Sequence, residues 1–544
     1  MAGTTNRAAG IGAIAALALA GAVAGWWFPH SAPETRGPNV LFIVWDTTRA
    51  DRMSLYGNPR PTTPRLVEYA KDAVVYEQAR ATDMWTMPSH AAMFTGLPTS
   101  SHGVNTDWRW LDSHYLTLPE HFAAAGWDTY GFTANQFASQ NCNLFQGMSA
   151  YDTVWQGEFA KASRNATREK RIARDRSTEI SPGWKPDPSV PNMMWSRGMA
   201  KDAAPVAHEA LIQWVTGRKD PEKPWFAFIN MMEAHWPRVP SMAAREQVLD
   251  PAVLEKGFET DATLFTALSY NLRRHDYTDE EVAAQVGVYD AALVDLDSAT
   301  GALLDDLKAR GVLDDTIVVI TADHGEYLGD HHMFDHRYGL YDSMTHVPLV
   351  VRYPGKAAAR RVPGPVTTAG IWTEVVRLAG LEIPADGWRR ATLAENGAVV
   401  SEYPLYDNRA LDRFVKHYGD LDLTPWKRTL DAVVDGSWKL ISYHDHLDAE
   451  LYDLASDPGE THNLAAEQPA RVSELQGQID SWKRDVKPYE AGLRTSDDHP
   501  KSYTPSERQQ LEALGYLVGD EGADEEESDA PIPKAKGQKG KRQP

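Results

Sequence analysis

Cysteine is almost absent from this chain of 544 residues, which contains Cys142 alone. A single thiol excludes an intramolecular disulfide framework and any metal site that is built from several thiolates. A metal ion bound by this protein would therefore need oxygen and imidazole ligands. The sequence also contains no internal repeat.

Basic side chains are scarce relative to acidic ones, with 55 Lys and Arg against 76 Asp and Glu and a net charge of −21. A nucleic-acid partner needs a face rich in Lys and Arg, so the composition argues against one. The hydrophobic share of 42% is enough for a large core, and the length indicates more than one domain or subdomain.

The N-terminus carries an export or anchor signal. Arg7 is followed by an uncharged stretch over residues 8–28, which is rich in Ala and Gly and ends in two tryptophans and a phenylalanine. This length suffices to span a bilayer with the tryptophans at the interface, whereas Ala-Val-Ala at 22–24 is a pattern that a signal peptidase cuts. Residues 1–37 therefore predict a membrane anchor or a cleaved signal peptide. The protein is expected to be exported to the periplasm or cell envelope, either membrane-anchored or secreted.

A continuous apolar run over residues 39–45 predicts a strand that is buried on both faces. Asp46 follows it directly. An acid at the carboxyl end of a buried parallel strand lies where open α/β sheets bind ligands. The alternative is a structural role, in which residues 46–51 form a helix cap with an acid in the first turn.

Thr86 lies next to a proline turn, in front of an apolar helix that ends near Gly96. Pro88 disfavours helix at the residue before it, so we expect Thr86 and Met87 to be extended and the helix to begin at Pro88. A side chain in that place points at the helix N-terminus, which favours an anion. Thr86 is therefore a candidate nucleophile, the alternative being a threonine that only caps the helix.

Two further apolar runs, residues 224–230 and 316–321, predict buried strands whose ends lead into histidines. His235 follows the first run. Asp323 and His324 follow the second, and the next residue is a glycine, which lets backbone come close and fits a metal-binding corner. Residues 330–337, which include His336, are dense in imidazoles and carboxylates. The alternative for each histidine is a solvated surface loop.

The rest of the chain continues the α/β rhythm. Residues 118–126, 280–310 and 467–483 have the apolar spacing of helices, and residues 127–133 predict another strand. Residues 164–197 are polar, charged and proline-bearing, so they predict a surface insertion.

Short motifs along the chain then follow a familiar order. They are residues 39–46 with Arg49 and Asp51, Pro88-Ser89 with Thr95-Gly96, 102–104, 290–301, 321–326, 340–342 with 347–350, 438–440, 450–454 with 457–458 and 463–464, and 514–516. In this order they resemble the sulfatase family of the alkaline phosphatase superfamily, over roughly residues 38–518. Each motif is weak alone, but the ordered set is specific.

Three positions depart from the family pattern. Sulfatases carry Cys or Ser, converted to formylglycine, where this chain has Thr86, and an arginine where it has His90. Thr47 replaces the family's second N-terminal acid. Threonine is not a known substrate for the conversion, and the pattern is more similar to superfamily relatives that use an unmodified threonine against phosphoesters. The resemblance thus implies sulfate ester cleavage, whereas Thr86 better suits phosphate or phosphonate esters.

The resemblance also implies one divalent metal ion, because an anionic ester repels an anionic nucleophile and a cation lowers the pKa of the attacking hydroxyl. Asp46, Asp323 and His324 are the implied ligands, together with the Thr86 oxygen. Mixed oxygen and nitrogen ligands fit Mn²⁺ or Zn²⁺, while Ca²⁺ is the commoner ion in relatives with all-oxygen sets. His235 and His336 fall where relatives place residues that contact the anion or protonate the leaving group.

We expect an α/β fold like that of alkaline phosphatase, with a large mixed sheet between helices. The predicted parts are a catalytic domain over residues 38–395, a smaller C-terminal α+β subdomain over 396–518, and a disordered charged tail over 519–544.

The predicted function is an exported metal-dependent hydrolase of sulfate or phosphate-type esters, whose substrate is a small molecule, a glycan or a lipid head group. Two alternatives stay open. One is a membrane-associated transferase that moves a phospho-head group through a Thr86-linked intermediate. The other is a non-catalytic binding protein that kept the fold.

Overall fold

A computed structural model describes residues 37–177, 201–260, 264–355, 359–394, 397–404, 411, 415, 418–419, 421–445, 449–499, 502–505, 507–508 and 511. The predicted signal or anchor stretch, the boundary at residues 395 and 396 and the charged tail lie outside these residues. The second half of the predicted insertion also lies outside them, whereas its first half belongs to a helix that ends at Ser177. Within the described ranges, no helix is long and apolar enough to cross a membrane.

The largest element is an eight-stranded mixed sheet of order β10-β2-β9-β6-β1-β5-β3-β4. Its strands are β1 (Asn39–Trp45), β2 (Val74–Arg80), β3 (Asp128–Thr133), β4 (Ala150–Thr153), β5 (Trp225–Met231), β6 (Thr316–Thr321), β9 (His346–Arg352) and β10 (Arg360–Thr367). β1 runs parallel to both β5 and β6, whereas β9 runs antiparallel to β6 and β2. β1, β5 and β6 are buried along their whole length, which explains their uninterrupted apolar runs.

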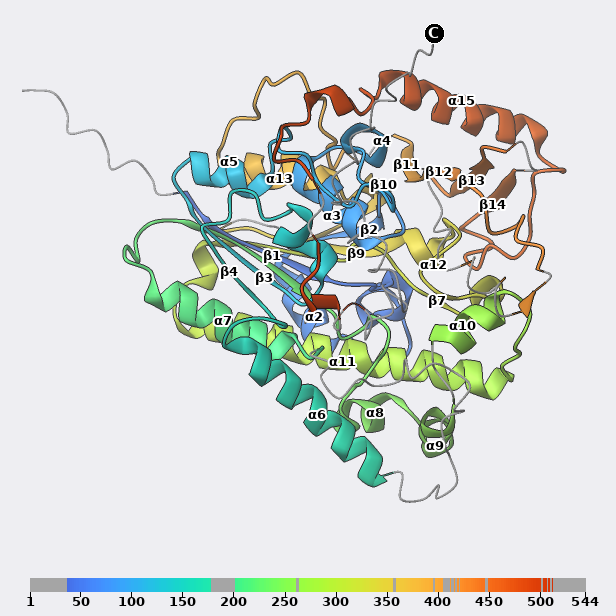
Figure 1. The fold of residues 1–544 in the computed structure, drawn as a ribbon, viewed down its shortest axis with the longest axis horizontal. Coiled ribbons are helices and arrows are strands. Elements are labelled where there is room, and N and C mark those ends of the chain that lie inside the picture. The colour runs from blue at the N-terminus through green and yellow to red at the C-terminus, as the bar shows by residue number, and fades with distance from the viewer. Residues whose placement is uncertain are drawn as a thin grey trace, which may run out of the picture. The chain divides into compact units, whose positions relative to one another are not determined.

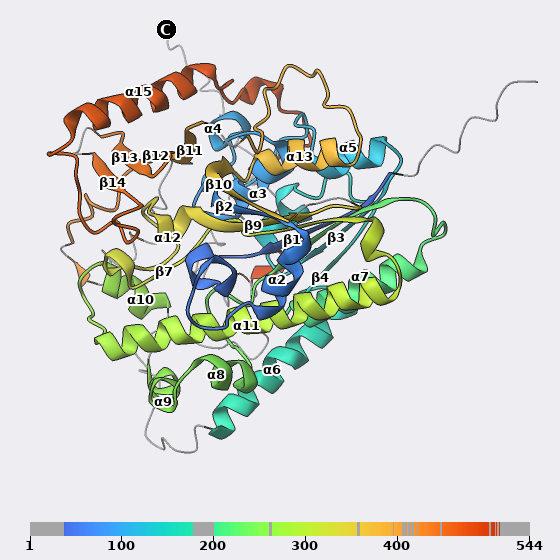
Figure 2. The same cartoon turned by 180° about the vertical axis from the view of Figure 1, so that it is seen from behind.

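Helices cover both faces of this sheet. The helices of the described residues are α2 (Pro64–Tyr69), α3 (Thr86–Thr95), α4 (Thr99–His102), α5 (Leu118–Ala124), α6 (Phe159–Ser177), α7 (Ala204–Gly217), α8 (Met242–Val248), α9 (Pro251–Glu259), α10 (Leu264–Asn271), α11 (Asp279–Ala309), α12 (Asp342–Thr345), α13 (Gly370–Leu378) and α15 (Pro469–Asp485). In Figure 1, α3, α5 and α13 lie above the strands, and α2, α7 and α11 lie below them; the reverse view in Figure 2 shows the same two layers.

A second sheet is antiparallel and has the order β11-β12-β13-β14. Its strands are β11 (Val399–Tyr403), β12 (Leu430–Asp435), β13 (Trp438–Tyr443) and β14 (Glu450–Asp453). α15 lies across this sheet (Figure 1). Its Leu475 and Ile479 share a hydrophobic core with Val433 and Leu440. The predicted fold class, a large mixed sheet between helices with a small antiparallel sheet, is confirmed.

One local prediction is wrong. The helix that was expected to begin at Pro88 begins at Thr86, and the extended residue in front of it is Trp85, with φ −131° and ψ 149°. A proline is tolerated in the first turn because the N–H that it lacks has no acceptor within the helix. Thr86 and Met87 are therefore helical, and Thr86 itself opens α3.

The strand register brings the candidate residues together. Val44 of β1 pairs with Asn230 of β5 on one side and with Thr321 of β6 on the other. Asp46 and Asp323 lie two residues beyond Val44 and Thr321, so the two carboxylates end at the same level of adjacent strands. This edge is the carboxyl end of the parallel part of the sheet, where α/β proteins bind ligands.

Candidate active site

Asp46 and Asp323 form a buried pair of carboxylates at the end of β1 and β6, and both side chains are fully buried. Oδ2 of Asp46 accepts hydrogen bonds from Asn135 Nδ2 at 2.9 Å and Asn230 Nδ2 at 3.2 Å. Oδ1 of Asp323 accepts from the backbone N–H of Thr47 at 3.1 Å and of His324 at 2.9 Å. The other oxygens, Asp46 Oδ1 and Asp323 Oδ2, have no hydrogen-bond partner among the described residues.

These carboxylates are poised to accept a cation. Burial raises the pKa of Asp46 to about 7, and the charge of Asp323 adds to the effect. Burial also raises the pKa of Asp323 to about 7. Two buried acids with an unpartnered oxygen each are costly unless a positive charge binds between them.

His324 completes this group. Its Nδ1 donates to the Gly325 carbonyl at 2.9 Å, so Nε2 carries the lone pair that a metal ligand needs. Burial, followed by the charge of His336, lowers the pKa of His324 to about 4, which keeps the imidazole neutral. Gly325 is required here, since a Cβ in its place would lie 2.0 Å from the Ser343 carbonyl oxygen. Ligand atoms of Asp46, Asp323 and His324 lie within 4.8 Å of one another, and this donor set fits a divalent ion.

Thr86 lies beside this group, as the sequence predicts. Its Oγ1 is 3.4 Å from His324 Nε2 and 3.4 Å from Asn135 Nδ2, and the side chain is fully buried. Because Thr86 is the first residue of α3, its hydroxyl also lies at the positive end of a ten-residue helix.

His90 occupies the position where the sulfatase pattern has arginine. Its Nδ1 donates to the Thr86 carbonyl at 2.8 Å and lies 3.6 Å from Asp323 Oδ2. Burial lowers the pKa of His90 to about 3, so the imidazole is neutral.

His235 and His336 both lie at the site, with ring centres 5.0 Å apart, and the ring of His336 is 4.8 Å from that of His324. Burial lowers the pKa of His235 well below its usual value. Burial also disfavours the charged form of His336, but the carboxylates of Asp335 and Glu326 outweigh it and raise the pKa. The surroundings therefore favour the neutral form of His235 and the charged form of His336.

A second group of potential ligands, which the sequence analysis did not anticipate, consists of Glu326, Asp335 and His336. Its carboxylates already face guanidinium groups. Glu326 Oε2 lies 2.8 Å from Arg238 Nη2, and Asp335 Oδ2 lies 2.5 Å from Arg337 Nη1. Because these cations occupy the carboxylates, the group of Asp46, Asp323 and His324 is the better candidate for a metal site.

Four residues that sequence reasoning missed support the site. Asn135 and Asn230 orient Asp46, and both lie at or just beyond the ends of strands that the sequence did predict. The hydroxyl of Tyr289 on α11 donates to the Thr47 carbonyl at 2.7 Å and holds the turn after Asp46. No local pattern marks a helical tyrosine for that role.

Lys201 is the fourth residue that supports the site. Its buried Nζ donates to the backbone carbonyls of Glu233, His235 and Pro237. Burial lowers its pKa to about 7. These contacts hold the loop that carries His235, although Lys201 is 34 residues away in sequence.

Comparison with known proteins gives matches over most of the chain. The family model described as Sulfatase matches residues 38–381, and the model described as N-sulphoglucosamine sulphohydrolase, C-terminal, matches residues 329–485. An N-acetylglucosamine-6-O-sulfatase of Bacteroides thetaiotaomicron is 22% identical over 523 residues, which cover 84% of this chain and 88% of the relative. An ulvan-active sulfatase of Formosa agariphila is 23% identical over 519 residues, covering 92% of this chain and 91% of the relative.

Among solved structures, the phosphonate monoester hydrolase of Agrobacterium radiobacter has the same fold. It superposes with a TM-score of 0.59 at 22% identity, covering 86% of this chain and all (100%) of the hydrolase.

Proposed function

This protein belongs to the sulfatase family and is a hydrolase of sulfate- or phosphate-type esters, and from that premise we propose that the Thr86 hydroxyl is its nucleophile. The observation that carries the proposal is the position of Thr86 Oγ1, 3.4 Å from His324 Nε2 and at the N-terminus of α3. The hydroxyl is next to two buried carboxylates that each have an unpartnered oxygen within the described structure.

Asp46, Asp323 and His324 are the proposed metal ligands, with the Thr86 oxygen as a fourth. A divalent cation bound there, Mn²⁺, Zn²⁺ or Ca²⁺, would lower the pKa of the Thr86 hydroxyl and neutralise the ester oxygens. Asn135 supports the same oxygen, because its amide Nδ2 is a donor and favours a negative charge on Thr86 Oγ1.

His336 is the proposed general acid. In the first step the bond from Thr86 Oγ1 to phosphorus or sulfur forms, the bond to the leaving oxygen breaks, and that oxygen takes a proton from His336. The hydroxyl proton of Thr86 passes to solvent. In the second step the oxygen of a water molecule forms a bond to phosphorus or sulfur, and the water gives a proton back to His336. The bond to Thr86 Oγ1 breaks, and this oxygen takes back a proton from solvent. The raised pKa of His336 supports this role, because the neighbouring carboxylates favour the protonated form that donates the proton.

His235 has a different proposed role, in contact with the anion or the attacking water. Its Nδ1 donates to the Trp236 carbonyl, which leaves the lone pair on Nε2. A neutral imidazole with that tautomer accepts a hydrogen bond from a water molecule or a protonated ester oxygen.

We propose phosphate or phosphonate esters as the substrates that Thr86 cleaves best, since an unmodified hydroxyl forms a simple ester that water must hydrolyse. The fold shared with a phosphonate monoester hydrolase is consistent with this choice. The names of the sulfatase relatives point to glycans as the group that carries the ester. Export of the protein through residues 8–28 remains part of the proposal, as does the division into domains at residues 395 and 396.

The experiment is hydrolysis of matched aryl sulfate, aryl phosphate and aryl phosphonate monoesters by purified protein that was stripped of metal and reloaded with Mn²⁺, Zn²⁺ or Ca²⁺. We expect turnover that needs metal and is faster with the phosphorus esters. Faster turnover of the sulfate ester would overturn the substrate assignment. Turnover at the full rate in the stripped protein would overturn the metal role.

A further inference from the structure

A pocket opens beside the start of α3, and its lining includes Trp85, which directly precedes the helix, and Pro88 in the first turn of the helix. It encloses about 580 Å³ of empty space, part of which is open to solvent. His336 lines the same pocket, and its ring lies 4.8 Å from that of the metal-site residue His324. The pocket therefore borders the candidate active site through His336, the proposed acid that meets the leaving group.

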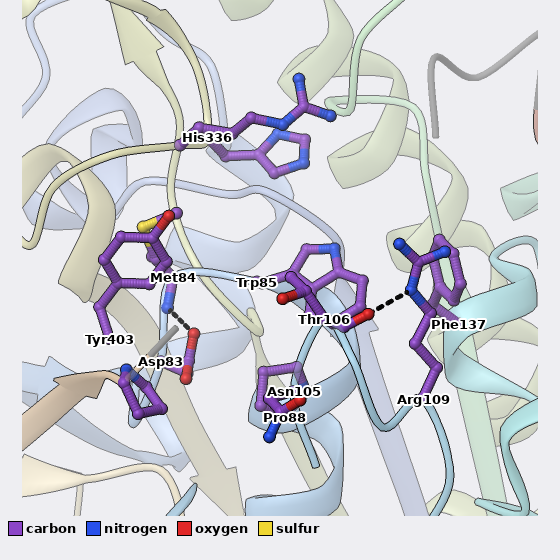
Figure 3. Close-up of a pocket in the computed structure, with 12 residues that line it drawn as sticks. Asp83, Met84, Trp85, Pro88, Asn105, Thr106, Arg109, Phe137, His336 and Tyr403 are labelled. Carbon is purple, nitrogen blue, oxygen red and sulfur yellow. Dashed lines mark hydrogen bonds between the residues drawn. The ribbon is translucent and has the colours of Figure 1, made fainter. Parts of the chain in front are cut away.

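Rings line much of this pocket. Figure 3 shows Tyr403 and Met84 on one side, Phe137 with Arg109 on the other, and Trp85 between them. A pocket wall made of aromatic rings favours a flat or ring-shaped ligand group, because aromatic side chains bury a large area of such a group with little loss of side-chain entropy.

Arg109 brings a positive charge to these rings. Its guanidinium carbon lies 5.7 Å from the centre of the Trp85 ring and 5.5 Å from that of Phe137, and its Nε donates to the Thr106 carbonyl at 3.1 Å (Figure 3). Within the described parts of the chain, no carboxylate forms an ion pair with Arg109. These ring contacts hold the guanidinium at the pocket wall, and its terminal nitrogens have no charged partner among the described residues.

The other charges of the pocket do not neutralise Arg109. Arg337 is paired with Asp335 at 2.5 Å. Asp83 also lines the pocket, but burial raises its pKa to about 8, and the charge of Glu402 adds to the effect. At neutral pH Asp83 is therefore largely protonated, and the uncompensated charge of the pocket is positive.

From these observations we propose that the pocket binds the leaving group of the ester, and that this leaving group is a ring with a second anionic group attached. Arg109 is the residue that pairs with the second anionic group. The inference rests on the proposed function, since it names the substrate class of the same site. The substrate would then be doubly anionic, with one charge on the ester that Thr86 attacks and the other on the ring, as a carboxylate, sulfate or phosphate. A guanidinium is suited to this role because it binds such groups through two parallel hydrogen bonds.

The test compares two ring esters that differ only in charge, a 4-carboxyphenyl and a 4-carbamoylphenyl ester of the acid group that the wild type cleaves. The quantity compared is the kcat/KM for the carboxylate ester divided by the kcat/KM for the carboxamide ester. We expect this ratio to be at least about tenfold higher in the wild type than in Arg109→Met. The intrinsic reactivity of the two leaving groups cancels in this comparison. Arg109→Lys should keep part of the preference, because it keeps the charge and loses the planar fork.

Arg471→Met is the matched control. Arg471 also stacks on a tryptophan, with its guanidinium carbon 5.2 Å from the centre of the Trp438 ring, but it lies on α15 and not in the pocket. The ratio of the two substrates should be unchanged in this variant. If Arg109→Met leaves the ratio unchanged, whether or not kcat/KM falls equally for both substrates, the inference is overturned and Arg109 has a structural role.

A binding measurement separates this inference from the proposed function. Binding of 4-hydroxybenzoate and 4-hydroxybenzamide, the two leaving groups, is measured by calorimetry or NMR on the wild type and Arg109→Met. If neither ester is cleaved, the proposed function fails, but tighter binding of the benzoate that is lost in Arg109→Met still supports the inference. Equal binding of both compounds by the wild type overturns the inference even where the esters are cleaved.

Discussion

The imidazole of His90 donates a hydrogen bond to the backbone carbonyl of Thr86, one turn earlier in α3, over 2.8 Å. His90 is fully buried, and burial lowers its pKa to about 3, so it makes this contact as a neutral group. It fixes the first turn of the helix that carries the hydroxyl without adding a charge. The positive charge that an anionic ester requires must then come from other groups, which makes the metal ligands and His336 the residues to test first.

Removal of a carboxylate from the metal site should remove the metal. We expect Asp46→Asn and Asp323→Asn each to lose the bound divalent ion and at least about 100-fold in kcat/KM, since each loses one of two charged ligands. The fold should persist, because the change also relieves the repulsion between two buried acids. Elemental analysis and circular dichroism measure the two effects.

Asp152→Asn serves as the control for these variants. Asp152 also lies on a strand of the large sheet, where it accepts a hydrogen bond from Tyr130 at 2.8 Å and is remote from the metal ligands in sequence. Full metal occupancy in Asp46→Asn and Asp323→Asn would show that these residues are not the ligands.

Lys201→Met should lower activity through the position of His235. The substitution keeps the length of the side chain but removes the donor to the carbonyls of Glu233, His235 and Pro237. We expect a fall of about tenfold or more in kcat with metal occupancy unchanged, since a small displacement of a reacting group is costly. Lys223→Met, which removes a half-exposed lysine paired with Asp128, is the control and should have no such effect. A wild-type kcat in Lys201→Met would show that Lys201 does not position His235 for the reaction.

Asp498→Asn should destabilise the protein in a pH-dependent manner. Burial favours the neutral form of Asp498, but hydrogen bonds from Ser113, Thr495 and Trp110 outweigh it and lower the pKa. A lowered pKa gives stability that is fully present above the unfolded value of about 3.9 and is lost as pH falls through the folded value. We expect the variant to lose about 1–3 kcal/mol in free energy of unfolding at pH 7.

Denaturant titrations between pH 7 and pH 3 measure this difference, with the exposed neighbour variant Asp497→Asn as the control. The loss should shrink below about pH 4. A loss that stays constant down to pH 3 would mean that the charge of Asp498 contributes nothing to stability.

The sequence predicted the fold where hydrophobic patterns are strong. The buried runs before Asp46 and Asp323 became β1 and β6, because parallel central strands are apolar on both faces. The residues that support the site were not predictable in this way. Tyr289 and Lys201 act through contacts that span 242 and 34 residues, and no local pattern marks such contacts. The start of α3 was misplaced by two residues, because the rule for residues before proline was overridden in the first turn.

Thr86 variants separate the nucleophile from the rest of the site. Thr86→Ala should lose at least about 1,000-fold in kcat, whereas Thr86→Ser should keep a measurable part because the attacking oxygen survives. Both should retain the metal, since Asp46, Asp323 and His324 are intact. A wild-type rate in Thr86→Ala would make water the attacking group.

The most direct measurement is the mass of the peptide that contains Thr86, in His336→Ala protein incubated with metal and a phosphate or phosphonate ester. Without the proposed acid and base, the second step should slow, and we expect a phosphoryl or phosphonyl group to accumulate on Thr86. The adduct should be absent from the double variant with Thr86→Ala. No adduct on Thr86 in protein that still turns over the ester would contradict covalent catalysis by this residue.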